Sequence, residues 1–299
     1  MPTNAAIELR FDRFLLPSSG LDAGLALYAG NPPANRVGLD TEYDLIERVV
    51  VLRPTRALQP NTLYVAEIPI SSNPKRGFWA LDGAPLAAGA VPFRFSFSTG
   101  SGPSSQQPTA APPSPDTCDT LTQGALSTCA GCHASTPADA SGAAQFPPMG
   151  LDLSSSRGLY YTAIGRVAHQ TETANSIANT GLRTPARFGV QMNIVDPGNP
   201  ATSYLMYKLL QKPENFRLGS DEAACPTAYH SPVAEGSCTP PSADEVAQLR
   251  EWFVHGDPMP KNGRSADGSV LSASTDHANL VRIARWIASG AVCAEPGAQ

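Results

Sequence analysis

The stretch Cys129-Ala130-Gly131-Cys132-His133 decides the fold and chemistry of the second half of the chain. Its spacing is C-x-x-C-H, in which two thiols lie three residues apart and a histidine follows at once. Two such thiols can each form a thioether with a vinyl group of one porphyrin, and the histidine then stands close enough to ligate the iron. The sequence therefore predicts one covalent haem c, attached at Cys129 and Cys132, with His133 as the proximal iron ligand.

Three other uses of the two thiols stay open at this point. A thioredoxin-like redox pair follows a strand in a βαβ pattern, and no such pattern precedes Cys129. A structural zinc site uses a second Cys or His pair at short spacing, and the remaining cysteines are not arranged in that way. A plain disulfide between Cys129 and Cys132 is the third alternative.

The composition favours turns and loops over long helices. The 299 residues include 25 glycines and 29 prolines but only 16% charged side chains. Residues 1–100 carry nine basic and nine acidic side chains, so the net charge of −5 comes from residues 101–299, which carry twelve and seventeen. This acidic half argues against nucleic acid and anionic membranes as partners. No run of 18 apolar residues is present, so we expect no transmembrane segment.

The first hundred residues predict an all-β domain. Apolar and polar residues alternate within Ala6–Phe11 and Phe93–Phe97, and the apolar runs Val49–Leu52 and Leu63–Ile68 are typical of strands. Turn-forming residues separate these segments, a spacing that predicts a β-sandwich. This half shows no catalytic constellation. Its scattered acids are expected to be solvated rather than to bind metal: Asp12, Asp40, Asp44 and Glu47.

Three motifs of this half resemble a bacterial Ig-like domain, a module of secreted bacterial proteins. They are Ile-x-Leu-x-Phe-Asp-Arg (Ile7 to Arg13), Leu-x-Pro-x-x-x-Leu-x-Pro-x-Thr-x-Tyr (Leu52 to Tyr64) and Phe-x-Phe-x-Thr-Gly (Phe95 to Gly100). The resemblance covers about residues 4–100 and implies an Ig-like sandwich over residues 1–100. Tyr64 is then either a corner tyrosine whose hydroxyl bonds a nearby backbone group or a half-buried strand residue.

Residues 101–116 predict a linker between two domains. Five prolines stand there among small polar residues, a composition typical of a semi-extended tether. The second domain is therefore expected to cover residues 117–299.

Apolar residues at helical spacing predict that this second domain is mainly α. Serines 154–156, Asn199 with Pro200, and the capping box Ser242-Ala243-Asp244-Glu245 are helix-start patterns, and Gly290 is a helix stop. The expected helices are about Cys118–Thr128, about Arg157–Val167, one from Asn199 through Leu210, one that begins at Ser242, and about Thr275–Ser289.

Several short motifs follow the haem motif in a recognisable order. They are Gly-Leu-Asp-Leu (150–153), Val-Asp-Pro-Gly-Asn-Pro-Ala-Thr-Ser-Tyr-Leu (195–205), Met-Pro (259–260) and Trp-Ile-Ala-Ser-Gly-Ala (286–291). As a set they resemble the planctomycetal-type cytochrome c domains of large exported bacterial proteins, over roughly residues 117–293. The resemblance implies a monohaem cytochrome c-like fold. In the family, Met-Pro stands shortly before the Trp-Ile helix. Here the gap to Trp286 is long, and Thr239 stands where Met would precede the Trp252 helix.

The ligand opposite His133 decides the chemistry of the iron. A Met thioether raises the reduction potential and suits electron transfer, whereas an open position admits small molecules. Met259 is favoured as the distal iron ligand, because its proline neighbours stiffen the backbone. Met149 or Met192, in predicted loops, is the fallback, and a His or an open position remains an alternative.

Other conspicuous side chains are expected to be structural. Met206 should lie in the core. The remaining histidines should be ordinary surface or helix-face residues: His169, His230, His255 and His277. The larger aromatic residues should pack in the core or against the porphyrin: Trp252, Trp286, Tyr160, Tyr161, Tyr204 and Tyr207.

Four cysteines remain after haem attachment, and an exported protein would pair them as two disulfides with three possible connectivities. Reduced thiols in a cytosolic protein are the other reading. We favour Cys225–Cys238, which would pin an excursion that contains Pro and Gly. Cys118–Cys293 would then tie the first helix of the domain to its end, as the packed terminal helices of cytochromes c imply.

Together these patterns predict an exported monohaem cytochrome c that works by outer-sphere electron transfer, with iron cycling between two oxidation states on His133 and a Met. We expect a redox partner protein, and the acidic haem half allows it a basic docking face. We expect a periplasmic or cell-surface location. Because Met1-Pro2-Thr3-Asn4 shows no signal peptide, the sequence indicates a mature or trimmed chain, with lipid anchoring before trimming as one option.

Two further functions stay open. One is a haem enzyme, a peroxidase or small-molecule oxidoreductase, with an open distal site. The other is a surface adhesion or assembly protein in which the Ig-like domain is the binding module. The sequence favours an electron carrier over an enzyme.

Overall fold

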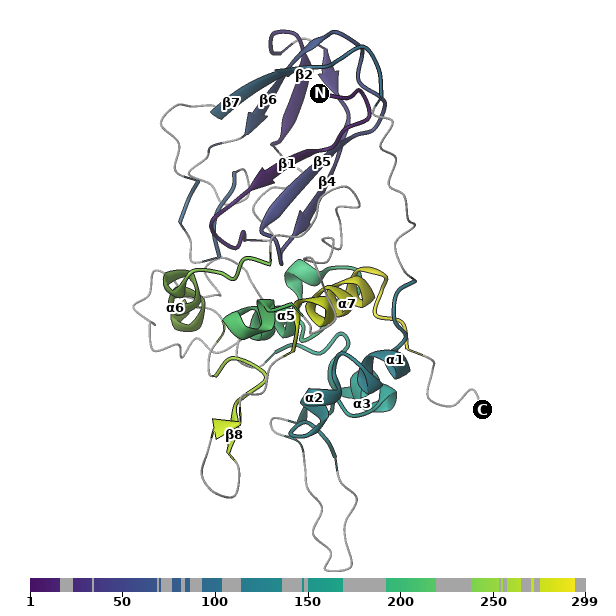
Figure 1. Ribbon diagram of the computed structural model, residues 1–299, viewed down its shortest axis with the longest axis vertical. Coiled ribbons are helices and arrows are strands. Elements are labelled where there is room, and N and C mark those ends of the chain that lie inside the picture. Colours follow the sequence, from purple (N-terminus) through teal and green to yellow (C-terminus); the bar gives the residue numbers. More distant parts are fainter. Residues whose placement is uncertain are drawn as a thin grey trace, which may run out of the picture. The chain divides into compact units, whose positions relative to one another are not determined.

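The computed structural model divides the chain into two compact units (Figure 1). The first comprises Met1–Pro112, and the second comprises Pro113–Tyr229 and Ala234–Gln299, so the division falls inside the predicted linker. The structure describes residues 1–16, 24–33, 35–68, 70, 77–81, 84–86, 93–103, 114–135, 147, 150–168, 192–218, 238–252, 254, 257–264, 270–271 and 275–293.

Two antiparallel sheets make up the first unit. One has the order β1 (Ile7–Arg10), β5 (Val49–Pro54), β4 (Leu39–Asp44). The other has the order β3 (Arg36–Val37), β2 (Ala26–Ala29), β6 (Leu63–Ile68), β7 (Phe93–Ser98). The all-β prediction is therefore correct at this level, whereas its assignment to the Ig-like family stays a prediction.

The apolar run in β5 is the centre of the three-stranded sheet. Val49, Val50, Val51 and Leu52 are all buried, so both faces of this strand are covered, and β5 pairs with β1 on one edge and with β4 on the other. A strand that is buried on both faces reads as a continuous apolar run rather than as an alternation, which is why this segment was predictable.

Tyr64 is a corner tyrosine, so the structure decides between its two readings. The side chain is buried in β6, and its hydroxyl accepts a hydrogen bond from the backbone N–H of Gln59 at 2.8 Å. Its ring also stacks on Phe97 of β7, with 5.6 Å between ring centroids. The hydroxyl thus satisfies a backbone donor in the turn before the strand.

Two acids that were expected to be solvated are instead buried in the turn between β4 and β5. Asp44 is fully buried, and its Oδ1 accepts from the backbone N–H groups of Ile46 at 3.0 Å and Glu47 at 3.1 Å. Glu47 is also buried and lies 3.6 Å from the guanidinium of Arg10. The expectation of solvation was wrong here because a short acid can cap a tight turn from inside.

Short helices and one small hairpin make up the second unit. They are α1 (Cys118–Gln123), α2 (Ser127–Ala130), α3 (Ser156–Thr162), η3 (Pro200–Thr202), α5 (Tyr204–Leu210), η4 (Pro213–Phe216), α6 (Ala243–Trp252), α7 (His277–Ala288), β8 (Gly263–Arg264) and β9 (Val270–Leu271). The mainly α prediction holds at this coarse level. Two expected helices are each broken in two, at Gly124 and at Ser203.

Close packing explains the break after α1. A Cβ at Gly124 would lie 3.0 Å from a guanidinium nitrogen of Arg282 on α7. Arg282 in turn binds the Asp116 carboxylate through two hydrogen bonds of 2.9 and 3.0 Å. Asp116, the last residue of the predicted linker, is thereby bound to α7 in the second unit.

The helix α7 packs one side into the core of the second unit, against α5, η3 and η4. Asp276 caps its start by accepting from the Asn279 N–H at 2.8 Å. Gly290, just after the end of the helix, has a φ of +101°. Its buried residues recur at helical spacing and leave only the side with Ala278, Arg282 and Arg285 partly exposed: His277, Leu280, Val281, Ile283, Ala284, Trp286 and Ile287.

A disulfide joins Cys118, the first residue of α1, to Cys293, which follows α7, and their Cα atoms are 5.0 Å apart. This is one of the two pairs that the sequence analysis predicts. Cys238 is also disulfide-bonded, and its expected partner Cys225 lies outside the described residues.

We predict that the double variant Cys118→Ala/Cys293→Ala lowers the free energy of unfolding of the second unit by about 5 kcal/mol. The bond closes a separation of 175 residues, and a loop of this size restricts the unfolded chain strongly. Denaturant unfolding monitored by far-ultraviolet circular dichroism measures the loss. A loss below about 1 kcal/mol would contradict the chain-entropy account.

Candidate functional site

The haem motif lies on the turn that leaves α2. Leu121 of α1 and Leu126 before α2 are fully buried, which fixes this short helix against α1. The carbonyl of Cys129 accepts from the backbone N–H groups of Cys132 at 3.1 Å and His133 at 2.8 Å. The turn therefore brings all three predicted haem residues together. Both thiols are free, with Cys129 half-buried and Cys132 exposed.

One hydrogen bond orients the imidazole of His133. Its Nδ1 lies 3.2 Å from the carbonyl oxygen of Leu151, and the N–H of Leu153 donates to the His133 carbonyl at 2.8 Å. Because a carbonyl oxygen can only accept, Nδ1 must carry the proton and Nε2 keeps its lone pair. This is the arrangement in which a histidine binds a metal through Nε2.

Burial also favours the neutral form of this ring. Desolvation lowers the pKa of His133 below its ordinary value, although the hydrogen bond to Leu151 opposes the shift. A neutral imidazole is the form that ligates a metal.

The segment that carries Leu151 is itself held tightly. Asp152 Oδ1 accepts from the N–H of Ser154 at 2.9 Å and from its hydroxyl at 2.6 Å, while the Asp152 N–H donates to the Thr162 hydroxyl at 2.9 Å. Gly158 of α3 packs so closely that an added Cβ would lie 2.6 Å from the Asp152 carboxyl carbon. The Gly-Leu-Asp-Leu motif is thus a rigid support for His133.

The thiol of Cys129 is not activated as a nucleophile. Burial, with a smaller effect from Cys132, raises the pKa of Cys129 to about 11. Reactive thiols have a lowered pKa, so the environment of Cys129 does not favour a thioredoxin-like redox pair. Among the described residues, no group of three or more His, Cys, Asp or Glu side chains is arranged to hold a metal ion.

The methionines occupy different environments. Met206 lies fully buried in α5, as expected for a core residue. Met192 is also buried, and its carbonyl accepts from the Ala168 N–H at 2.9 Å. Met259 is half-buried on a segment after α6. Met149 lies outside the described residues. Within the described part of the chain, no hydrogen bond joins Met259 to His133.

A buried row of polar side chains, which we call the polar stripe, faces the segment that carries Met259. Its members are Lys208, Gln211, Lys212 and Asn215, spaced as i, i+3, i+4 and i+7 along α5 and η4. We call residues 257–262 the Met259 loop. Sequence reasoning missed the stripe, because polar residues at helical spacing normally indicate a solvated face.

The stripe donates to four backbone carbonyls of residues 254–260. Lys208 Nζ binds the Asp257 oxygen at 3.0 Å, and Lys212 Nζ binds the Pro260 oxygen at 2.8 Å. Asn215 Nδ2 binds the Met259 oxygen at 2.9 Å. Gln211 Nε2 reaches the Val254 oxygen at 3.4 Å, just before the loop.

The two stripe lysines are charged groups in a costly position. Burial lowers the pKa of Lys208 to about 8, although the charge of Asp257 opposes the shift and Arg250 adds to it. Burial likewise lowers the pKa of Lys212. Hydrogen bonds to carbonyls are therefore what makes these positions tolerable.

The aromatic prediction was only partly right. Trp286, Tyr204 and Tyr207 are buried, whereas Tyr160 and Tyr161 are 37% and 46% exposed on α3. They face solvent because Gly158 and Leu159 form the buried face of that short helix. Nothing is described for the side chain of Trp252.

Apart from His133, the structure describes one histidine, His277. His277 is fully buried at the start of α7, with its ring 6.0 Å from that of Phe216, so it is a helix-face residue of the core. His169, His230 and His255 lie outside the described residues.

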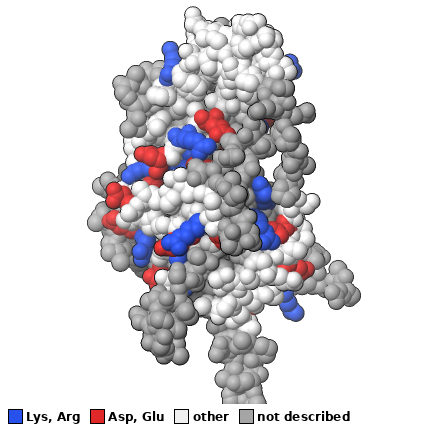
Figure 2. Space-filling model, in the orientation of Figure 1, with Lys and Arg blue, Asp and Glu red and all other residues white. Residues whose placement is uncertain are grey.

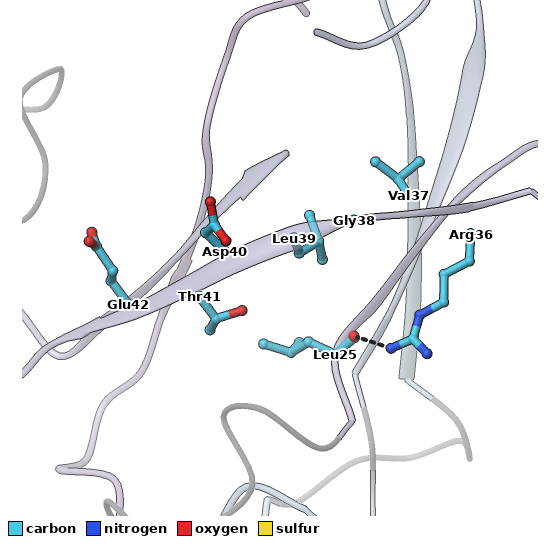
Figure 3. A pocket seen from close by; sticks show the side chains of 8 residues that line it. All are labelled: Leu25, Arg36, Val37, Gly38, Leu39, Asp40, Thr41 and Glu42. Carbon is cyan, nitrogen blue, oxygen red and sulfur yellow. Dashed lines mark hydrogen bonds between the residues drawn. The ribbon is translucent and has the colours of Figure 1, made fainter. Parts of the chain in front are cut away.

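A shallow pocket of about 670 Å³ lies in the first unit, where the chain crosses from β3 to β4 at Gly38 (Figure 3). Asp40 and Glu42 point to one side of β4 and Thr41 to the other. Arg36 already donates to the Leu25 carbonyl at 3.3 Å, and Glu42 already pairs with Arg53 at 3.2 Å. These charges do not converge on one point, so the pocket shows no catalytic arrangement.

On the face shown in Figure 2, basic and acidic side chains are interspersed rather than gathered into one patch. Among the described residues, no helix combines the length and hydropathy that crossing a membrane requires.

No family model matches the chain, and no curated protein matches it. Among solved structures, the chain is similar to surface layer protein SbsC, domains 1–6, with 8% sequence identity and a TM-score of 0.26. The match covers 49% of this chain and 18% of that one. The chain thus matches less than a fifth of that structure.

We predict that Gly158→Ala destabilises the second unit by about 1–3 kcal/mol, because the new Cβ would overlap Asp152. The displaced segment should also disturb the Nδ1–H tautomer of His133, which nitrogen NMR of the ring reports. Gly131→Ala is the matched control, since its Cβ would be 3.7 Å from the Thr128 carbonyl. Equal stability of the two variants would refute the support role of α3.

We predict that the free energy of unfolding of the wild type rises between pH 8 and 10.5 relative to that of the Lys208→Met variant. The folded state releases the Lys208 proton at about pH 8, whereas the unfolded chain keeps it up to the ordinary value of 10.5. The unfolded state therefore holds more protons in this range, which favours folding as pH rises, by up to about 3 kcal/mol.

Below about pH 7 the difference between wild type and Lys208→Met should be constant. Urea unfolding at successive pH values measures the curves, and Lys261→Met, at an exposed position of the Met259 loop, controls for the loss of a lysine. Parallel curves for wild type and Lys208→Met up to pH 10.5 would count against a buried charge at this position.

Proposed function

We propose that this protein is an exported c-type cytochrome that carries one covalent haem and transfers electrons. The observation that carries the proposal is the environment of His133. Its Nδ1 donates to the Leu151 carbonyl, so Nε2 is left as a ligand beside two free thiols at thioether spacing. The cysteine pairing supports the same reading, because Cys118 pairs with Cys293 and leaves the two motif cysteines unoxidised.

Each residue then has a definite task. Cys129 and Cys132 would bind the porphyrin covalently, and His133 would ligate the iron with its ring held by Leu151. Met259 would supply the distal sulfur from a loop that the polar stripe fixes. When bound, haem supplies reversible one-electron chemistry, and the protein sets its potential and solvent access.

The second unit, on this proposal, is a planctomycetal-type cytochrome c domain. Its bonded first and last helices, α1 and α7, and the support of His133 by the Gly-Leu-Asp-Leu motif are consistent with the motif order in the sequence. The first unit is proposed as a bacterial Ig-like domain that serves as a spacer or docking element. Two antiparallel sheets and the corner tyrosine Tyr64 support that assignment.

The proposed location is the periplasm or the cell surface. Haem attachment to Cys-x-x-Cys-His takes place outside the cytoplasm, and disulfides such as Cys118–Cys293 persist in oxidising compartments. The proposed partner is a redox protein with a basic docking face, which would complement the net charge of −5.

Expression with export in a host competent for cytochrome c maturation tests the proposal. We expect covalent haem and a low-spin optical spectrum with the weak red band of sulfur-to-iron charge transfer. Met259→Ala should lose this band and bind carbon monoxide, whereas Met192→Ala, the matched control, should keep it. His133→Ala should lose the low-spin spectrum.

Other results would redirect the proposal. Absence of covalent haem in the exported protein would overturn it. High-spin iron in the wild type, with cyanide binding that displaces no Met, would favour a haem enzyme with an open distal site instead.

A further inference from the structure

The backbone of Met259 is held from both sides. Its N–H donates to the Lys208 carbonyl at 3.0 Å, and its own carbonyl accepts from Asn215 Nδ2 at 2.9 Å. One residue before and one after the Pro-Met-Pro segment, Asp257 and Lys261 also pair with each other at 2.9 Å. The position of the Met259 Cα is therefore set by α5 and η4 and not by the loop alone.

Lys212 holds the following part of the loop. Its Nζ donates to the Pro260 carbonyl at 2.8 Å and to Asn262 Oδ1 at 2.7 Å, so one ammonium group spans two loop residues. The side chain is only 6% exposed. An ammonium group in such a position is retained only where its donors are used.

Asn215 links the loop to α7. The side chain is completely buried, its Nδ2 also donates to the Leu209 carbonyl at 2.8 Å, and its Oδ1 accepts from the Thr275 N–H at 3.1 Å. The amide thus joins α5, the Met259 loop and the segment before α7 through directional bonds.

This arrangement costs stability, but it fixes the position of the Met259 loop against α5. An apolar stripe on α5 would bury the same area without desolvating two ammonium groups, and such replacements are often neutral or stabilising. Directional donors, in contrast, allow only one register of the loop against the helix, because a shift leaves buried donors unsatisfied. A loop whose only task was to connect α6 to α7 would not need this definition.

We propose that Lys212 and Asn215 are positioning residues that hold the backbone of Met259 and of the loop after it, so that this methionine can serve as the distal ligand. The inference rests on the proposed function, since it concerns the same haem site. It adds a role for residues that contact neither haem nor iron: they hold the loop at one register, so that Met259 reaches the iron without a further ordering cost.

The test compares Lys212→Met with Lys261→Met in the exported, haem-loaded full chain. Both changes remove one lysine charge, but Lys261 is exposed and pairs with the Asp257 carboxylate, whereas Lys212 is buried and donates to Pro260 and Asn262. The measurements are the sulfur-to-iron band, the reduction potential, the affinity for added imidazole, and hydrogen exchange of the amides of residues 257–262.

We expect Lys212→Met to retain haem, to weaken the sulfur-to-iron band, to lower the potential, and to bind imidazole about tenfold more tightly. Loop amides should exchange about tenfold faster in this variant. Lys261→Met should behave as wild type, and Lys212→Arg, which keeps a donor, should recover part of the band.

A second variant, Lys208→Met, provides the test if Lys212→Met does not fold. Lys208→Met removes the donor to Asp257 together with a buried charge, so it is expected to fold, and it should change the band in the same direction as Lys212→Met. Wild-type spectra, imidazole affinity and loop exchange in both variants would overturn the positioning role while the haem function stands. Retention of the sulfur-to-iron band in Met259→Ala would overturn it as well. Failure of haem attachment in the wild type would instead overturn the proposed function itself.

Discussion

The hydrogen bond from His133 to the Leu151 carbonyl is the interaction on which the candidate site depends. It decides which nitrogen of the ring keeps its lone pair, and it does so through an acceptor that cannot reverse its role. The carbonyl is in turn placed by Asp152, Thr162 and the missing side chain at Gly158. A helix of seven residues, α3, thereby orients an imidazole that belongs to another turn of the chain.

The two proposed iron ligands are held by opposite kinds of chemistry. His133 is supported by backbone groups and one close glycine contact, whereas Met259 is supported by long side chains with charged or amide ends. The first arrangement is rigid because there is little room to move. The second arrangement fixes the position of the loop, because a displaced loop would leave buried donors without acceptors. The support of His133 therefore depends on residues close to it in the fold, whereas the support of Met259 depends on how α5 is packed.

Where a pattern reflects one local cause, it was predictable from the sequence. The apolar run Val49–Leu52 predicted a strand, and Gly290 marked the end of a helix whose apolar residues recur at helical spacing. Other features depend on distant partners. Gly124 breaks a helix because Arg282 approaches it, and β4 alternates acids with only modest apolar residues, so neither was evident beforehand.

The site shows the same division. Cys129, Cys132 and His133 lie within five residues of sequence, so their proximity was predictable from the spacing alone, whereas their use as a haem site stays a prediction. The role of Leu151 could not, because it uses a carbonyl that every residue has. The polar stripe was hidden for a different reason: lysines at helical spacing normally indicate a solvated face, and only the fold shows that this face is covered.

The bond between Cys118 and Cys293 has a mechanical consequence. Cys118 lies near the start of the second unit and Cys293 follows its last described helix, and their Cα atoms are 5.0 Å apart. Tension along the chain would therefore pass through one covalent bond and bypass the 175-residue loop that it closes. The helices that hold His133 and Met259 would carry none of that load, and the geometry around these two residues would be the same in a stretched chain as in a relaxed one.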